Sequence, residues 1–367
     1  MVQRSEGGGA VSDRRTDLLE RLSGAFGPSG CEREVRRMIA REIGCADAFE
    51  VLPIGDLLVK VKGRSEGPKL MFDAHMDEVG FMVESIDDDG FIRFRTLGGI
   101  DARVMCGRRV TLGSLDGLKR VPGVISSKPI HLLGGSGKTT PASELYISIG
   151  AKDRASAEKY VSVGDYGCFD TDFYRFGDHK LHGKALDDRL GCAVQIEAIH
   201  RLTADRPPQD VWFVFNVREE IGLSGAMAAA WRLRPEYAVA LEATACADIS
   251  DVPDGSRIGE QSMGGLISLA DGGTIYDDMM AGWAMELAQS RGIKAQYKRM
   301  CTGGNDAAGI QRTAAGVRVM ALSAPSRYIH SESNVVDERD YFAMIDLVEA
   351  MAREISSLDA KVRGICR

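Results

Sequence analysis

Long apolar runs are absent from this sequence. No uninterrupted stretch approaches the roughly 20 residues that a membrane-spanning helix needs. The first segment, Met1 to Val11, is polar and rich in glycine, and it lacks the apolar middle of a signal peptide. We therefore expect a cytoplasmic protein with no membrane partner, in which residues 1–12 form a flexible tail.

An excess of basic residues is absent as well. The chain has 46 Lys and Arg against 53 Asp and Glu, a net charge of −7, and both signs are mixed along its length. Nucleic acids and anionic membranes are bound through a basic face. Neither is expected as the main partner, although a local basic pocket is not excluded.

Paired cysteines and two common catalytic motifs are also missing. The eight cysteines are scattered and form no CxxC pair, so neither a disulfide framework nor a thiolate zinc site is indicated. No GxSxG serine elbow and no P-loop is present. Nucleophilic serine chemistry and a phosphate-binding loop are therefore not expected.

The composition is that of a globular protein large enough to enclose a site. The chain has 367 residues, of which 44 % are hydrophobic and 27 % charged, and this length suits two domains. Outside residues 85–180, apolar periodicity predicts alternating helices and strands. Helices are expected at 16–25, 32–43, 190–202, 277–291 and around 345–355, and strands at 57–61, 69–74, 211–217, 237–241 and 317–322.

Residues 85–180 have a different pattern of hydrophobic and turn residues. Short alternating runs such as Phe91 to Arg95 are broken by frequent turn residues, which indicates a small β domain with one helix near residues 155–160. The alternation of strand and helix elsewhere predicts an α/β fold, a sheet covered by helices on both faces. The simplest arrangement joins residues 1–84 and 181–367 into one domain and treats 85–180 as an insertion.

Histidines and carboxylates follow the ends of the predicted strands, where ligands of open α/β sheets gather. His75 and Asp77 follow the first of these strands, Glu219 and Glu220 follow Val211 to Val217, and Glu242 ends another. A neutral imidazole binds divalent transition metals, and Asp77 could fix its tautomer. Adjacent glutamates at the end of a buried strand are costly to enclose without a cation or a partner.

Two further candidates have simpler explanations when taken alone. Asp187 and Asp188 stand at a helix start, where aspartate is favoured as a cap, and His330 is a single histidine in a loop. His182 is a rival metal ligand near Asp187. Together the set exceeds what one metal needs, and it predicts a two-metal site.

The motifs GPSGCE, AHMDEVGFMV, VPGVISSKPIHLL, GKALDDRLGC, REEIGLSGA, GGNDAAGI and SRYIHSES occur in this order. In this respect the chain resembles the tetrahedral aminopeptidases, cytosolic di-metal peptidases also labelled glutamyl aminopeptidase or cellulase M. The resemblance implies a zinc-exopeptidase-like mixed sheet sandwiched by helices, with an inserted small β-barrel or PDZ-like domain that mediates dimers. Six such dimers would assemble into a dodecamer.

The same resemblance implies roles for single residues. His75 and Glu242 would bind one divalent metal (Zn, Co or Mn), Glu220 and His330 the other, and Asp187 would bridge them. Glu219 would be the general base in the hydrolysis of N-terminal residues from short peptides, Asp77 would orient His75, and the Asp187–Asp188 peptide would be cis. Many relatives have Asp in place of Glu242, GGTDA for GGNDA at 303–307, and HSP for HSE at 330–332, so substrate preference does not carry over.

Two alternatives remain open at this stage. A glycoside hydrolase would need two metal-free carboxylates flanking a sugar, for which the neighbouring Glu219 and Glu220 are poorly placed. The second alternative is a metal-bound oligomeric scaffold that has lost its catalytic activity. The presence of Glu219, the expected general base, argues against this alternative.

Overall fold

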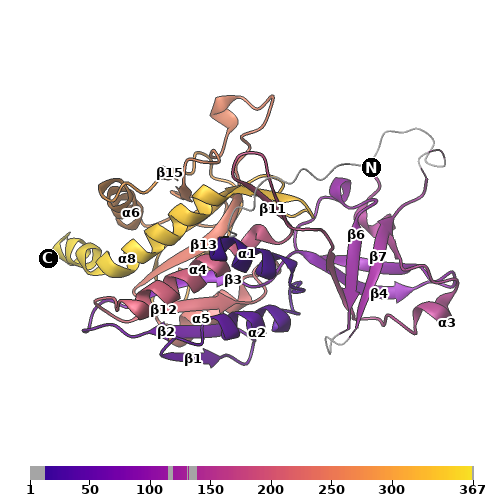
Figure 1. The fold of residues 1–367 in the computed structure, drawn as a ribbon, viewed down its shortest axis with the longest axis horizontal. Coiled ribbons are helices and arrows are strands. Elements are labelled where there is room, and N and C mark those ends of the chain that lie inside the picture. The colour runs from indigo at the N-terminus through magenta and orange to yellow at the C-terminus, as the bar shows by residue number, and fades with distance from the viewer. Residues whose placement is uncertain (1–12, 115–118, 130, 132–138, 366–367) are drawn as a thin grey trace.

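The computed structural model describes residues 13–114, 119–129, 131 and 139–365. The expected tail, residues 1–12, lies outside this range. Figure 1 shows two bodies: a large sheet covered by helices, and a smaller barrel beside it.

The large sheet has eight strands in the order β1-β2-β12-β3-β13-β16-β14-β15. The inner strands β12, β3, β13 and β16 are parallel, β1, β2 and β14 run antiparallel to their inner neighbours, and β15 is parallel to β14. The strand bounds are β1 Ala48–Val51, β2 Leu57–Val61, β3 Leu70–His75, β12 Val211–Asn216, β13 Tyr237–Ala245, β14 Gly265–Ile267, β15 Ala295–Tyr297 and β16 Arg318–Ser326.

Helices cover both faces of this sheet, as the alternation of elements predicts (Figure 1). One face packs against α1 Arg14–Gly24, α2 Arg33–Glu42, α4 Leu186–Ala204, α6 Asp278–Ser290 and α8 Glu338–Ile365. The other packs against α5 Ser224–Leu233 and α7 Ala307–Ile310. Because β3 and β12 lie between these layers, nearly every residue in them is buried, which explains their continuous apolar runs.

The smaller body is a closed barrel with the strand order β4-β5-β8-β7-β6-β9. Its elements are β4 Gly80–Ile86, β5 Ile92–Leu97, β6 Arg109–Gly113, β7 Arg120–Ser126, β8 Tyr146–Ser148, α3 Arg154–Ala157 and β9 Tyr166–Phe169. It has a hydrophobic core of its own, with Phe81 packed edge-on against Phe94 and Phe169. The mixed α/β sheet with a small β-barrel confirms the expected fold class.

The chain returns from the barrel through a three-stranded sheet, β10-β11-β17. Its strands are β10 Tyr174–Phe176, β11 Lys180–Gly183 and β17 Asn334–Asp337. The barrel strands therefore run from Gly80 to Phe169, and strand β4 spans the boundary expected between residues 84 and 85. Strand β10 pairs with β11, and β11 pairs with β17 in the C-terminal part of the chain.

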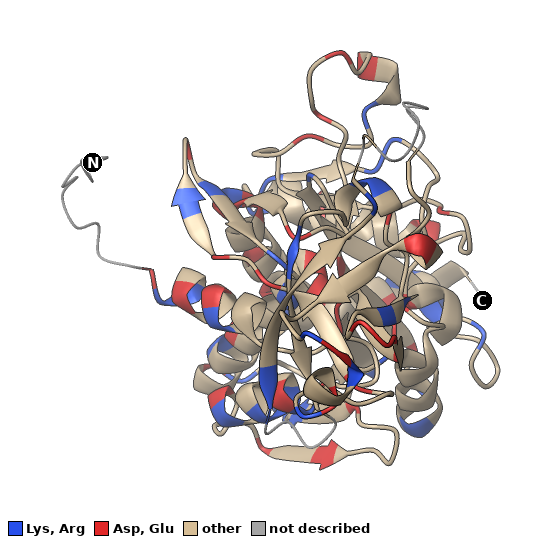
Figure 2. Cartoon of the chain, turned by 90° about the vertical axis from the view of Figure 1, so that its right-hand side faces the viewer, with Lys and Arg blue, Asp and Glu red and all other residues tan. Residues whose placement is uncertain are grey.

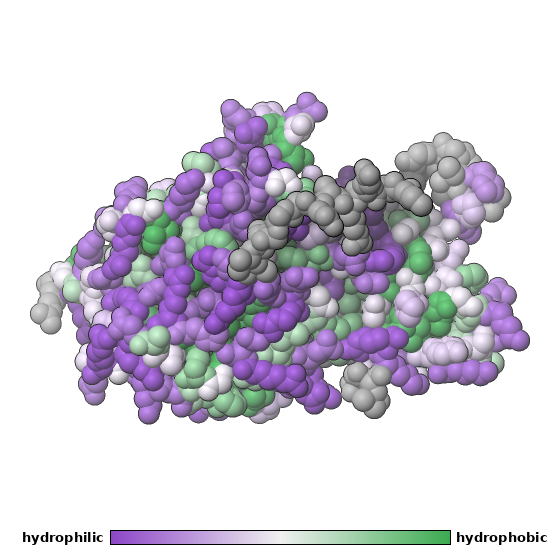
Figure 3. All heavy atoms as spheres, in the orientation of Figure 1, coloured by the Kyte–Doolittle hydropathy of each residue, from purple (hydrophilic) through white to green (hydrophobic). Residues whose placement is uncertain are grey.

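The surface carries charges of both signs. Figure 2 shows Lys and Arg interspersed with Asp and Glu on the barrel side, and Figure 3 shows a face covered mainly by hydrophilic residues. None of the described helices is long and apolar enough to cross a membrane.

Candidate metal centre

The parallel strands end at one edge of the sheet and bring distant residues together there. Strand β3 ends at His75, which is in register with Asn216 at the end of β12, and Glu219 and Glu220 follow that strand. Glu242 lies on β13, His330 follows β16, and Asp187 is in the first turn of α4. The seven predicted site residues therefore meet at the carboxyl ends of the strands, where side chains from different crossovers converge.

Asp187 stands at the centre of the cluster. Its Oδ1 lies 3.5 Å from Nε2 of His75, and its Oδ2 lies 3.2 Å from Nε2 of His330. Glu242 Oε2 lies 3.7 Å from the same His75 nitrogen, and Glu220 Oε1 lies 3.3 Å from the same His330 nitrogen. Each aspartate oxygen thus faces a different histidine, and a different glutamate lies near each of those histidines.

These separations fit ligands of a common cation. Two atoms bound about 2.1 Å from one tetrahedral ion lie about 3.4 Å apart. Asp187 Oδ1 and Glu242 Oε1 are buried and accept no hydrogen bond from any residue that the structure describes. Two sets of side chains converge closely enough to hold a metal ion: His75 with Asp187 and Glu220, and His75 with Asp188 and Glu242. The donor set, imidazole and carboxylate, suits a divalent transition metal.

The histidines are held so that Nε2 of each faces this cluster. Nδ1 of His330 lies 2.8 Å from the carbonyl oxygen of Gly99, in the loop after barrel strand β5. Nδ1 of His75 lies 3.1 Å from the carbonyl oxygen of Asp77 and 3.4 Å from its carboxylate. These contacts favour the tautomers that leave Nε2 free to bind a metal.

The Asp77 carboxylate does more than face His75. It accepts hydrogen bonds from the backbone N–H groups of Glu219 and Glu220, at 3.1 and 3.3 Å, and from the hydroxyl of Ser29 at 2.5 Å. It therefore holds the turn that carries both glutamates. Sequence reasoning missed Ser29, although it lies in the quoted motif GPSGCE.

The electrostatics of the cluster show a surplus of negative charge. Burial, assisted by the charge of Asp187, raises the pKa of Glu220 to about 7. Burial also raises the pKa of Glu219, and burial with Asp188 and Glu219 raises that of Glu242. Burial opposes the charged form of His330, but Asp187 and Glu220 raise its pKa to about 9. Cations bound among these groups would reverse the carboxylate shifts.

A second group of buried charges supports the site from behind. Lys184 Nζ lies 2.7 and 2.8 Å from the two carboxylate oxygens of Glu78, and Arg189 donates to Glu78 at 3.2 Å. All three side chains are almost fully buried. Since Glu78 follows Asp77 and Lys184 lies three residues before Asp187, this group joins the two ligand-bearing segments. Sequence reasoning did not single out Glu78, Lys184 or Arg189.

Other details of the backbone agree with a constrained site. The Asp187–Asp188 peptide is cis, as the resemblance implies, and Ala185, Arg218 and His330 have φ angles of 51°, 60° and 60°. Non-glycine residues in the left-handed region are uncommon and cluster at functional sites. Gly98 has φ 85°, and a Cβ there would lie 2.8 Å from Val79 and 3.2 Å from Glu220, so a side chain would crowd the glutamate.

His182 does not join the cluster. Its ring stacks on Tyr174 at 4.2 Å, and its Nδ1 lies 3.1 Å from the carbonyl oxygen of Asp172. Asp188, by contrast, belongs to one of the two candidate ligand sets, although no ligand role was predicted for it.

Comparison with known proteins agrees with this geometry. A family model described as M42 glutamyl aminopeptidase matches residues 55–347. The chain belongs to this family. A putative aminopeptidase of Acetivibrio thermocellus is 36 % identical over 338 residues, which cover 91 % of this chain and 98 % of that protein.

Solved structures of M42-like enzymes share the fold. A TET aminopeptidase from a marine sediment archaeon of the Thaumarchaeota is similar with a TM-score of 0.90 and 31 % identity, covering 95 % of this chain and 99 % of that one. The TET1 peptidase of Pyrococcus horikoshii, described as assembling into a tetrahedron or a large octahedral shell, has a TM-score of 0.83 and 34 % identity over 93 % and 99 % of the chains. The protein is thus a metal-dependent hydrolase of the aminopeptidase class.

Proposed function

We propose that this M42 protein is a two-metal aminopeptidase that removes N-terminal residues from short peptides. The observation that carries the proposal is the position of Asp187, whose two oxygens face His75 and His330 separately. In this proposal His75 and Glu242 would hold one ion, Glu220 and His330 would hold the other, and Asp187 would be shared between them. Zn, Co and Mn are all compatible with these ligands.

When bound, a divalent metal pair lowers the pKa of a coordinated water and polarises the scissile carbonyl. Glu219 supplies the proton transfer: its carboxylate accepts the proton of the attacking water and donates it to the leaving amine. Asp77 keeps Glu219 in place through the backbone N–H that it accepts.

The test is Glu219→Gln. The amide keeps the shape of the side chain and the hydrogen bond from its backbone, but it cannot take up the proton. We expect the variant to bind the same amount of metal and to hydrolyse aminoacyl-4-nitroanilides about 10²- to 10⁴-fold more slowly. Near-normal turnover with full metal loading would refute the role of Glu219.

The assembly state belongs to the same proposal. We propose that residues 1–84 and 181–367 form the catalytic unit and that the barrel, inserted between them, mediates dimers that build a dodecamer. The support is the similarity to TET aminopeptidases, of which the P. horikoshii TET1 peptidase can assemble into a tetrahedron or a large octahedral shell. A closed particle would admit short or unfolded peptides and exclude folded proteins.

A cytoplasmic location stays a prediction, and cell fractionation would test it.

A further inference from the structure

A cavity of about 670 Å³ lies between helix α2 and the β1–β2 connection, and its lining includes Arg218, which directly precedes Glu219. This volume is within the range of cavities that bind small molecules. Six of its lining residues are arginines from three separate parts of the chain: Arg33, Arg36, Arg37, Arg41, Arg120 and Arg218. Its only acidic lining residues among those described are Glu32 and Glu34.

Most of this positive charge is not neutralised. Arg120 forms an ion pair with Glu34 at 2.7 Å, and Arg36 donates to the carbonyl oxygen of Gly55 at 2.8 Å. The side chains of the remaining four arginines make no hydrogen bond or ion pair with any other residue that the structure describes. Burial, together with the charges of Arg33 and Arg37, lowers the pKa of Arg36, although Glu32 opposes this shift. The cavity therefore attracts anions.

The cavity also adjoins the groups that carry the chemistry. Arg218 directly precedes Glu219, whose N–H donates to Asp77. On the opposite wall, Gly30 follows Ser29, whose hydroxyl donates to the same carboxylate. The charge of Asp77 contributes, after burial, to raising the pKa of Glu32 to about 7, which shows how close this wall lies to the site.

The direction of the substrate follows from the role of Glu219 and so rests on the proposed function. Glu219 must return its proton to the amine of the departing peptide. The new N-terminus of that peptide therefore lies beside the Glu219 side chain. Arg218 and the cavity lie next to this position. A peptide extends by about 3.3 to 3.6 Å per residue, so residues following the cut bond can reach the arginines.

We propose that the arginine-lined cavity binds carboxylates of the departing peptide, so that short acidic peptides are the preferred substrates. A guanidinium binds a carboxylate through two parallel hydrogen bonds, and several arginines can accept an acidic side chain or the C-terminal carboxylate at variable positions. The preference concerns residues after the cut bond and is independent of the N-terminal residue.

The experiment uses the metal-loaded enzyme and peptides that share the best-cleaved N-terminal residue. One series carries Glu or Gln at the second, third or fourth position, and the other carries a free or an amidated C-terminus. Each pair compares a peptide that has a carboxylate with its neutral counterpart. In at least one pair, we expect the KM of the peptide with the carboxylate to be about five- to tenfold lower. Loss of the preference on Glu→Gln substitution identifies a side-chain carboxylate, and loss on amidation identifies the C-terminus.

The double substitution Arg33→Gln with Arg37→Gln should bring the KM ratio of that pair close to one, and Arg37→Lys should keep most of it. The matched control is Arg363→Gln, which removes an exposed arginine from the last turn of α8. It should keep the wild-type ratio. Raised salt should weaken the preference, because these arginines are partly exposed.

Equal KM values in every wild-type pair, or a ratio that survives the double substitution, would overturn the inference. Failure of the proposed function looks different. In that case the wild-type enzyme would cleave neither the peptides nor an aminoacyl-4-nitroanilide.

Discussion

At the scale of single residues, the carboxylates of the candidate metal centre differ in which histidines they contact. Asp187 faces both histidines, whereas Glu242 lies near His75 and Glu220 near His330. A bridging ligand affects both ions, and a terminal ligand mainly affects one. The metal content of substituted proteins distinguishes these positions.

We therefore expect Asp187→Ala to lose both metal ions and Glu242→Ala to lose chiefly one. Elemental analysis of the purified proteins, after dialysis against the metal, gives the metal-to-protein ratio. A ratio near two for Asp187→Ala would contradict the bridging role. Glu332→Ala, in the loop after His330, is a suitable control, because Glu332 contacts Arg108 rather than the cluster.

The buried charges behind the site give a second prediction. Glu78 is held by Lys184 and Arg189 in a region with almost no solvent. Breaking a buried ion pair leaves an unpaired charge, which costs about 3 to 5 kcal/mol. Lys184→Met should destabilise the protein by about that amount in urea unfolding, and Glu78→Gln combined with Lys184→Met should recover part of the loss. An additive double variant would mean that the two residues are not coupled.

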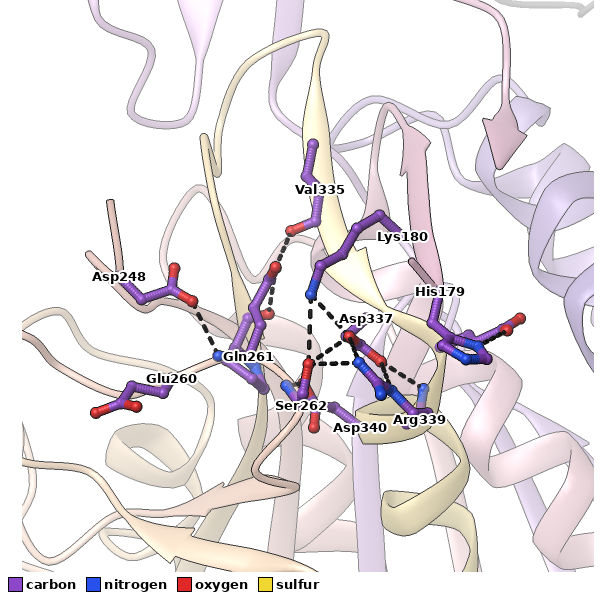
Figure 4. A network of polar contacts seen from close by, with 12 residues as sticks. His179, Lys180, Asp248, Glu260, Gln261, Ser262, Val335, Asp337, Arg339 and Asp340 are labelled. Carbon is purple, nitrogen blue, oxygen red and sulfur yellow. Dashed lines mark hydrogen bonds and ion pairs between the residues drawn. The ribbon is translucent and has the colours of Figure 1, made fainter. Parts of the chain in front are cut away.

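At the scale of elements, a polar network ties the start of α8 to strands β11 and β17 (Figure 4). Asp337 accepts hydrogen bonds from Lys180 at 2.7 Å, from the hydroxyl of Ser262 at 2.6 Å and from Arg339 at 2.8 Å. Asp340 accepts from the backbone N–H groups of Ser262 and Gly264. The network fixes the segment that leads from His330 into the last helix.

The pKa of Asp337 predicts how this network depends on pH. Burial alone would raise the pKa of this carboxyl, but hydrogen bonds from Arg339, Lys180 and Ser262 lower it below the usual value of 3.8. A depressed folded-state pKa contributes stability that is fully present above the unfolded pKa, about 3.9, and is lost as the pH falls through the folded pKa.

Asp337→Asn should therefore cost about 2 kcal/mol at pH 7, and the difference from wild type should shrink below about pH 4. Urea unfolding from pH 3 to pH 8 measures both. A difference that stays constant over this range would contradict the assignment. Asp101→Asn, in an exposed pair with Arg103 on the barrel, should change stability little at any pH.

At the scale of the whole molecule, the barrel and the α/β body meet at the active site. Gly99, in the loop after barrel strand β5, accepts from His330, and Gly98 leaves room for Glu220. The barrel thus completes the site as well as offering the proposed contact between subunits. Sedimentation velocity should show a particle of about twelve subunits, with a dimer as its intermediate. A monomer at all protein concentrations would refute the proposed assembly.

Much of this architecture could be predicted from local pattern. The apolar run Val211 to Val217 marks a buried parallel strand, and the periodicity of residues 277–291 marks α6, because side-chain spacing follows the geometry of each element. Short edge strands such as β14 and β15 were not predicted, since three residues carry too little periodicity and are stabilised by their neighbours in the sheet. The alanine-rich helix α5 was missed as well.

The sequence by itself determined the fold class, the family and the residues proposed for the metal site, because all of these are recorded in spacing and in short motifs. Only the tertiary structure decided which of these side chains lie against each other. The two oxygens of Asp187 turn toward different histidines, and Asp77 anchors the backbone of Glu219. The arginine cavity and the Glu78–Lys184–Arg189 group likewise join segments up to about two hundred residues apart. The physical reason is that a crossover sheet brings distant strand ends to one edge, and no local pattern encodes which side chains then face each other.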